Sequence, residues 1–380
     1  MSDPPHLLIV GGGLAGGLAA LALAERRPDL DVRLVEREES LGGNHVWSFF
    51  DSDVAREDLP LLAPLIVQRW EDHAVRFPKR RRRLDGRYQS ITSDRFHTHL
   101  HERLGERILH ADVAELRSDG ITLADGTEIA VRAVLDARGL AHAPDGLTCG
   151  WQKFVGQMIE VAGGHGLTAP VIMDATVDQS DGYRFVYLLP FDETRVFVED
   201  TYYQDEPALD RRILSQRIGA YAASQGWNDH RVLHEEQGVL PVVIGGDFDT
   251  FWPPDDPVAR AGVAGGFFHP LTSYSLPSAV RFASWLADAA PCDGARLAAL
   301  TRDWARMEWR DARFYRLLGK MLFRAADPPD RYRIFQRFYG LPDGLIERFY
   351  AGKSTLADKA RILAGKPPVS ITRAIRALME

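Results

Sequence analysis

The chain has 380 residues, of which 45% are hydrophobic and 26% charged, and its net charge at pH 7 is −7. These values are ordinary for a soluble globular protein and exclude a disordered or collagen-like chain. Cys149 and Cys292 are its two cysteines. Without a C-x-x-C or Cys/His spacing they predict neither a disulfide framework nor a metal site. A cytoplasmic location fits best.

The N-terminal residues 6–36 predict a strand, a glycine-rich turn, a helix and a second strand. Gly11, Gly13 and Gly16 fit the G-x-G-x-x-G pattern, in which glycines allow a tight turn, close approach to a pyrophosphate and close helix packing. Glu36 follows Gly16 by 20 positions, the separation at which an acid reaches the ribose hydroxyls of an adenosine. The segment therefore predicts a bound dinucleotide, with its phosphates at the helix N-terminus.

An alternative interpretation exists for residues 7–24, which form a run of 18 residues without a charge, long enough to span a membrane. Five of these residues are glycines, which weaken a spanning helix but suit a strand-to-helix turn. The N-terminus also lacks the basic region of a signal peptide. Nucleotide binding is therefore favoured over a membrane span.

Further elements of an α/β fold are expected along the next hundred residues. Residues 92–94 supply an N-cap for a helix that carries Arg95. Residues 108–113 resemble a short strand, and an Asp-Gly turn predicts a hairpin over residues 121–129. Another strand, at residues 131–135, runs into a turn of small residues that ends at Gly139, which we expect near the nucleotide.

The middle of the chain changes to a β-rich pattern typical of a second, substrate-facing sheet. Expected strands lie at residues 155–161, 183–189 and 194–201. Residues 263–270 then predict a strand that runs into a loop, and residues 277–288 predict a helix.

The C-terminal residues 302–380 carry 17 Lys/Arg against 9 Asp/Glu, a net charge of +8 that leaves −15 for residues 1–301. Their basic residues alternate with aromatic ones at 313–316 and 331–339. This composition suits a surface that contacts anionic lipid or nucleic acid, and a solvated helical cap is the alternative. A second basic run, at residues 79–83, could likewise contact lipid headgroups or form a solvated loop.

Several segments together resemble the bacterial lycopene β-cyclases, carotenoid cyclase flavoproteins that form β-ionone rings. The resemblance covers nearly the whole chain. The segments are GGNHVWSF at 42–49, MDATVDQ at 173–179, GYRFVY at 182–187, EDT at 199–201 and HPLTSYSLP at 269–277. In the last segment Ser273 stands where the family pattern has glycine.

The resemblance implies a glutathione-reductase-like FAD-binding Rossmann domain, an interleaved β-rich substrate domain and a C-terminal helical region. We expect the FAD domain at residues 1–50, 85–150 and 241–301, the substrate domain at 51–84 and 151–240, and the basic helical region at 302–380. FAD would act in its reduced form, with NAD(P)H as electron donor. Lycopene and related acyclic carotenoid ends would be the substrates, without net redox change.

Glu199 matches the proposed catalytic acid of the family, and its position agrees with the chemistry. Ring closure needs a proton delivered to an isolated alkene, and a carboxyl at the end of an apolar strand has a raised pKa because burial disfavours its charged form. The adjacent Asp200 would point to the opposite face of an extended strand. The alternative interpretation is that Glu199 and Asp200 are a surface pair at the end of a strand.

The loop at residues 269–277 offers hydroxyls and backbone N–H groups before a helix, and Thr272, Ser273 and Tyr274 are therefore expected to contact the flavin. His269 is a candidate proton shuttle, since histidine titrates near neutrality, although a structural role is the alternative. His45 has the same two interpretations.

A long apolar substrate dissolved in a bilayer requires an entrance that faces the membrane. We therefore expect peripheral attachment to the inner face of the membrane, and no nucleic-acid partner. Two other functions remain open: an FAD-dependent monooxygenase or desaturase acting on an isoprenoid, and a non-catalytic isoprenoid carrier on the same fold.

Overall fold

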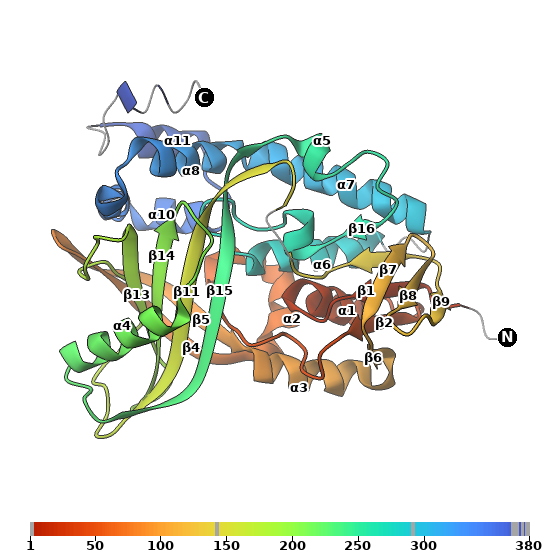
Figure 1. Ribbon diagram of the computed structural model, residues 1–380, viewed down its shortest axis with the longest axis horizontal. Coiled ribbons are helices and arrows are strands. Elements are labelled where there is room, and N and C mark those ends of the chain that lie inside the picture. Colours follow the sequence, from red (N-terminus) through yellow and green to blue (C-terminus); the bar gives the residue numbers. More distant parts are fainter. Residues whose placement is uncertain (1–3, 141–143, 290–292, 366–371, 374–375, 377–380) are drawn as a thin grey trace.

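The computed structural model describes residues 4–140, 144–289, 293–365, 372, 373 and 376. Figure 1 shows two sheet-based regions side by side, with the C-terminal helices running along one edge of both. Cys149 carries a free thiol, and Cys292 lies outside the described residues.

The first region is a parallel five-stranded sheet in the order β16-β10-β1-β2-β6. All four residues of its central strand β1 are buried, as expected of a parallel sheet covered on both faces. Its strands are β1 (Leu7–Val10), β2 (Val32–Glu36), β6 (Ile108–His110), β10 (Val134–Asp136) and β16 (Ala259–Arg260). Helices α1 (Leu14–Arg26), α3 (Ser93–Leu104) and α6 (Leu276–Ala289) pack together on one side. A small antiparallel sheet of β7 (Val113–Arg117), β8 (Gly120–Leu123) and β9 (Glu128–Ala130) lies beside it.

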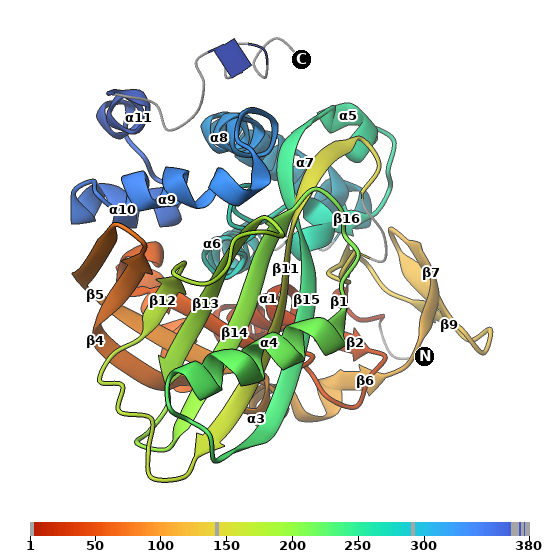
Figure 2. The same cartoon turned by 60° about the vertical axis from the view of Figure 1, so that its left-hand side comes forward.

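The second region is an eight-stranded mixed sheet in the order β15-β11-β14-β13-β12-β4-β5-β3. Its strands are β3 (Val46–Phe50), β4 (Ile66–Phe77), β5 (Arg80–Thr92), β11 (Leu147–Val161), β12 (Val171–Asp174), β13 (Tyr183–Pro190), β14 (Arg195–Gln204) and β15 (His230–Gly246). Helix α4 (Arg211–Ser224) covers the outer face (Figure 2). The inner face is apolar and packs partly against helices from the C-terminal region.

The C-terminal helices connect the two regions, because α7 packs beside β16 and α8 beside β15. They are α7 (Gly294–Asp311), α8 (Arg313–Ala325), α9 (Tyr332–Phe338), α10 (Asp343–Tyr350) and α11 (Leu356–Leu363). Two short helices, α2 (Leu59–Leu62) and α5 (Phe248–Phe251), lie in connecting segments. Within the described ranges, no helix is long and apolar enough to cross a membrane.

Most expected elements are confirmed. The uncharged run at residues 7–24 is divided between β1 and α1, so the membrane-span interpretation is wrong. Thr92 caps α3, its hydroxyl accepting a hydrogen bond from the Arg95 N–H, and β8 pairs with β9 as the predicted hairpin. The three strands expected in the middle of the chain correspond to β11, β13 and β14, the last of which begins one residue later than expected, at Arg195.

The strand expected to begin at residue 263 is not formed. Residues 262–265 form a 3-10 turn, and the neighbouring strand β16 ends earlier, at Arg260. Gly262 and Gly266 adopt positive φ angles of 59° and 76°, a conformation that interrupts a strand and favours glycine. The apolar residues of this segment are buried by packing around the turn and not by strand pairing.

Candidate functional site

A cavity of about 1020 Å³ extends from the carboxyl ends of β1, β2 and β10 to the inner face of the eight-stranded sheet. Its nucleotide end is lined by the glycine-rich turn, Glu36 and the segment from Asp136 to Gly139. Its other end is lined by side chains from β11, β13, β14 and β15. Parallel α/β sheets bind ligands at this edge, where the strands end.

The glycine-rich turn has the geometry that a dinucleotide requires. Gly11 has a φ of 109°, and a Cβ there would lie 2.8 Å from the backbone of Ala137. A Cβ at Gly16 would lie 2.0 Å from the Gly11 carbonyl oxygen, so helix and strand touch there. A Cβ at Gly13 would meet no atom within 4 Å, which leaves room for a phosphate at the start of α1.

Glu36 lies at the edge of this cavity with its carboxylate held by backbone donors. Oε2 accepts a hydrogen bond from Gly12 N at 2.7 Å and Oε1 from Glu38 N at 3.0 Å. A carboxylate has about four lone-pair sites, so both oxygens retain capacity for ribose hydroxyls. Gly139 also lines the cavity, and a Cβ at that position would meet open space.

Arg95 is not brought to the cavity. Its Nε donates to the Pro64 carbonyl at 2.7 Å, and its Nη1 lies 3.9 Å from Glu102 Oε2. The side chain thereby joins α3 to the preceding connecting segment. Its expected part in cofactor binding stays a prediction.

Thr272, Ser273 and Tyr274 line the cavity together, at the turn before α6. Ser273 has a φ of 56°, the one positive value among the non-glycine residues described, which explains why glycine suits this position in the family pattern. Its hydroxyl donates to the Pro241 carbonyl at 2.7 Å, so the side chain is engaged with β15. The Tyr274 hydroxyl donates to the Ser48 carbonyl.

His269 lies behind this loop and outside the cavity lining. Its Nδ1 accepts hydrogen bonds from the N–H groups of Leu271 and Thr272, both at 3.3 Å. Its ring packs against Tyr315 and Phe349. Burial lowers the pKa of His269 to about 3, so the ring is neutral at physiological pH. This geometry supports a positioning role for His269, and its role as a proton shuttle stays a prediction.

Glu199 lines the cavity from β14. Its Oε1 accepts a hydrogen bond from the Thr201 hydroxyl at 2.6 Å. Burial raises the pKa of Glu199 to about 7, with a smaller contribution from the neighbouring negative charge of Asp200. The carboxyl therefore retains its proton over a wider pH range than an exposed glutamate.

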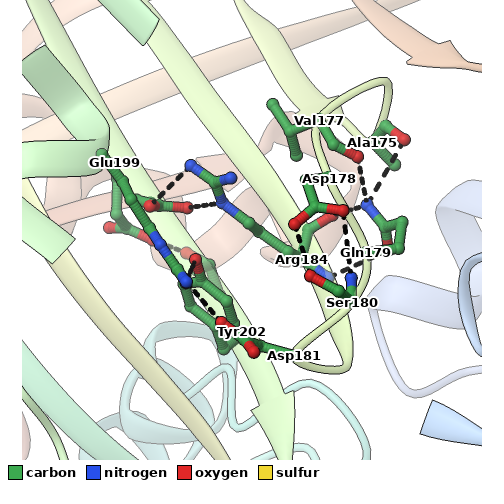
Figure 3. Close-up of polar contacts among 12 residues, drawn as sticks. Ala175, Val177, Asp178, Gln179, Ser180, Asp181, Arg184, Glu199 and Tyr202 are labelled. Carbon is green, nitrogen blue, oxygen red and sulfur yellow. Dashed lines mark hydrogen bonds and ion pairs between the residues drawn. The ribbon is translucent and has the colours of Figure 1, made fainter. Parts of the chain in front are cut away.

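Asp200 points to the opposite face, as the alternation of strand side chains predicts. It is completely buried and forms a two-point ion pair with Arg184, at 2.8 and 3.0 Å. Figure 3 shows Glu199 and the network around Arg184 and Tyr202 on neighbouring strands. Asp200 is therefore held in the layer beneath α4 and does not line the cavity.

Glu236 is a second carboxyl on the cavity wall, and none of the motifs described above predicted it. It is 3% exposed, and its Oε2 accepts a hydrogen bond from Val46 N at 2.8 Å. His45 Nδ1 lies 3.9 Å from the same oxygen. The Glu235-Glu236 pair repeats the pattern of Glu199-Asp200, two adjacent acids in a strand, and this repeat is the signal that could have revealed it.

Aromatic rings form much of the remaining wall. Tyr187 lies beside Glu199 in the register of β13 and β14 and lines the cavity, whereas Tyr183 and Phe185 of the same strand face pack in the core. Other lining rings are those of Trp47, Phe50, Tyr88, Phe154, Phe197 and Tyr350. Tyr350 comes from α10, so the C-terminal region completes one side of the cavity.

Some arginines of the two basic segments, residues 79–83 and 302–380, form contacts inside the protein. Arg82 donates from β5 to the carbonyls of Tyr339 and Leu341 and pairs with Asp343, so it anchors the C-terminal helices. Arg331 is 1% exposed and donates to backbone carbonyls and to Asp205. The basic composition of residues 302–380 therefore overstates the number of cations available to a surface partner.

The two regions and the cavity between them define the fold of FAD-dependent monooxygenases and reductases. A geranylgeranyl bacteriochlorophyll reductase-like protein from Thermoplasma acidophilum has 13% identity and a TM-score of 0.65, with 99% of each chain covered. The HpxO protein of Klebsiella pneumoniae complexed with FAD has 14% identity and a TM-score of 0.62, with 92% of this chain and 99% of that chain covered. At these identities the likeness concerns the fold alone.

The family is specified by sequence. The family model described as "Lycopene cyclase protein" matches residues 6–376. The lycopene beta-cyclase of Pantoea ananas is 46% identical over 378 residues, which cover 99% of this chain and 98% of that protein. The lycopene beta-cyclase of Pseudescherichia vulneris is 45% identical, with 98% and 97% covered. The chain belongs to the lycopene cyclase family.

Proposed function

We propose that the protein is a lycopene β-cyclase, an isomerase that converts the ψ ends of lycopene to β-ionone rings and yields β-carotene through γ-carotene. Membership of the family supports this function. The observation that carries it is the partly buried carboxyl of Glu199, which lies on an aromatic cavity wall continuous with the dinucleotide turn. An uncharged carboxyl in such a place is suited to protonate an alkene.

The chemistry requires one proton to be added and another to be lost. Glu199 donates its proton to the terminal double bond, and the tertiary cation that results is attacked by the neighbouring double bond to close the ring. Loss of a proton from the ring then leaves the β-ionone double bond. The faces of Tyr187, Phe197 and Tyr88 favour the positive charge, because an aromatic face carries negative electrostatic potential.

The residues present fit FAD as the bound dinucleotide. Gly11, Gly13 and Gly16 would accept the pyrophosphate, Glu36 the ribose, and the loop carrying Thr272 to Tyr274 the flavin ring. When bound in its reduced form, with NAD(P)H as electron donor, FAD supplies an electron-rich ring that favours nearby positive charge.

Product analysis tests this function. Purified protein is incubated anaerobically with reduced FAD and lycopene, and the carotenoids are separated and weighed by mass spectrometry. A cyclic product of unchanged mass supports a cyclase. A product that gains oxygen indicates a monooxygenase, a product that loses hydrogen indicates a desaturase, and bound isoprenoid without conversion or flavin absorbance indicates a carrier.

We also propose that the protein attaches peripherally to anionic membranes through α7 and α8 (Figure 2). Arg306, Arg310 and Arg313 are exposed there, beside Trp309 and Phe314. Exposed arginines near aromatic rings suit a lipid surface. Replacing these three arginines with glutamine is expected to abolish flotation with anionic liposomes, whereas unchanged flotation would exclude this surface. Arg331 is unsuitable as a target because it is buried.

A further inference from the structure

The strand register places Glu199 and Glu236 level with each other on the inner face of the large sheet. Gly156 of β11 is paired with Glu199 of β14 on one side and with Glu236 of β15 on the other. Directly paired residues project to the same face. Neighbouring strands are about 4.8 Å apart, so the two glutamate backbones are separated by roughly 10 Å, a span that two long side chains can bridge.

Gly156 has no side chain, and the ring of Phe197 occupies the space above it. A Cβ at this position would lie 2.3 Å from the Phe197 ring and 3.2 Å from Glu236 Cγ. Both glutamates line the same cavity. The sheet therefore presents Glu199 and Glu236 to one cavity, with the Phe197 ring packed over the glycine between their strands.

Neither carboxyl is neutralised by a lysine or arginine within the part of the chain that the structure describes. Glu199 accepts the Thr201 hydroxyl, and Glu236 accepts the Val46 N–H and faces His45 at 3.9 Å. Burial raises the pKa of Glu236 to about 9, and the charge of Glu199 contributes to this shift. Because two close carboxyls cannot readily ionise together, the pair keeps at least one proton near neutral pH, and the higher pKa of Glu236 places this proton on Glu236 in the resting enzyme.

We propose that Glu236 is a second catalytic carboxyl that works with Glu199 as an acid–base pair on the lycopene end group, an inference that rests on the proposed function. The O–H bond of Glu199 breaks as a C–H bond forms on the terminal alkene, and the next π bond closes the ring. A ring C–H bond then breaks, its electron pair forms the new double bond, and its proton passes to the carboxylate of Glu236. Return of that proton to Glu199 completes an isomerisation with no net gain or loss of electrons.

The local contacts favour this division of roles. The carboxylate of Glu236 is stabilised by a backbone N–H and lies beside His45, whereas the Glu199 carboxyl accepts a hydrogen bond from the Thr201 hydroxyl. The proton that rests on Glu236 passes to Glu199 when the end group binds, and the Glu236 carboxylate left behind is the stronger base of the two because its conjugate acid has the higher pKa. The half-exposed His45 gives the pair a connection to solvent.

The other titratable groups facing the pair do not compete for this proton. Burial lowers the pKa of His45, with His234 contributing, so its ring is neutral at the working pH. Burial raises the pKa of Tyr187 and of Tyr88 well above the ordinary value, and both phenols stay protonated.

The test compares Glu236→Gln with Glu235→Gln in the flavin-loaded enzyme. Glu235 is adjacent but lies on the other side of the strand, where Gln157, Ser215 and Arg211 hold it. We expect Glu236→Gln to keep flavin and lycopene binding, to lower kcat about 10²- to 10³-fold, and to lose one limb of a bell-shaped pH profile. Glu235→Gln is expected to stay within about twofold of the wild type, since removing an exposed pair costs little.

Two outcomes would overturn the inference. One is wild-type turnover by Glu236→Gln, and the other is reduced turnover that keeps both limbs of the profile, which would indicate a structural role. Should Glu236→Gln fail to bind flavin, Glu236→Asp decides, because its shorter carboxyl must shift one limb if Glu236 titrates in the reaction. A wild-type enzyme that forms no cyclic product would instead refute the proposed function.

Discussion

Acidic side chains have different partners on the two faces of the large sheet. On the outer face, Asp200 is paired with Arg184 and Glu235 with Arg211. On the inner face, Glu199 and Glu236 have no such cation among the described residues and border the cavity. Adjacent acids therefore differ in role because strand alternation sends one to a structural ion pair and the other to an apolar cavity wall.

The pKa shifts follow this difference between the faces. Burial acts to raise the pKa of Glu235 too, but hydrogen bonds from Gln157, Arg211 and Ser215 hold it below its ordinary value. For Glu199, burial prevails and raises the pKa to about 7. An acid that must donate a proton at neutral pH belongs on the face without cations.

The largest expected effect is on catalysis, from removing the inner-face acid. Glu199→Gln keeps the size of the side chain but removes the transferable proton, so ring formation should fall about 10³-fold, within the range of general-acid catalysis. Carotenoid product is measured by chromatography, and flavin absorbance confirms that the variant is folded. Turnover near the wild-type rate would remove Glu199 from the mechanism and end the distinction between the faces.

An outer-face substitution should act on stability. Asp200→Asn leaves the buried Arg184 charge uncompensated, and breaking such a pair costs about 3–5 kcal/mol. Urea unfolding followed by tryptophan fluorescence measures the loss. Glu235→Gln is the matched control, because Arg211 is 66% exposed and its pair contributes about 1 kcal/mol or less. Equal losses of unfolding free energy in both variants would contradict a larger contribution from the buried pair of Asp200 and Arg184.

How far the sequence predicts this arrangement depends on the range of the interactions. Local patterns were sufficient for the glycine-rich turn, for the Thr92 cap and for the opposite orientation of Glu199 and Asp200. The proximity of Glu199 and Glu236 was not predicted, because it depends on both strands pairing with Gly156 of β11. Register between distant strands is set by tertiary packing, which a periodicity of two does not encode.

The C-terminal region shows the same limit. Its alternating basic and aromatic residues predicted a surface, yet Arg331 is buried beneath the helices and Tyr350 reaches the cavity. Composition does not distinguish a cation that caps backbone carbonyls from one that faces solvent. The prediction of a strand from residue 263 was wrong for a related reason, since an apolar run is compatible with either a strand or a buried turn.

A pH experiment sharpens the comparison at the inner face. The pKa of Glu199 is about 7 in the native protein against an ordinary 4.5, so the native state binds a proton that the unfolded chain releases between these values. The contribution of Glu199 to the free energy of unfolding of the wild type is therefore fully present below about pH 4.5. It falls by about 3 kcal/mol as the pH rises from there through 7.

Glu199→Gln removes that penalty. The variant should match the wild type in unfolding free energy near pH 4 and exceed it by about 3 kcal/mol at pH 8. Thermal unfolding at the two pH values measures the difference, with Glu235→Gln as a control that should show no such gain. A constant offset at both pH values would mean that Glu199 is not buried as a neutral acid.

The smallest expected effect comes from displacing the Phe197 ring that packs on Gly156, between the strands of the two inner-face carboxyls. Gly156→Ala places a methyl group against the Phe197 ring and Glu236, and overpacking of this kind costs about 1–3 kcal/mol. Ring formation should fall roughly 10- to 100-fold, because displacing reacting groups by about 1 Å has effects of that size. Gly219→Ala on α4 is the control, since a Cβ there meets no atom within 4 Å and alanine favours a helix by about 1 kcal/mol. If Gly156→Ala destabilises the fold but leaves turnover unchanged, the close packing of Phe197 on Gly156 serves stability alone and the two carboxyls act independently.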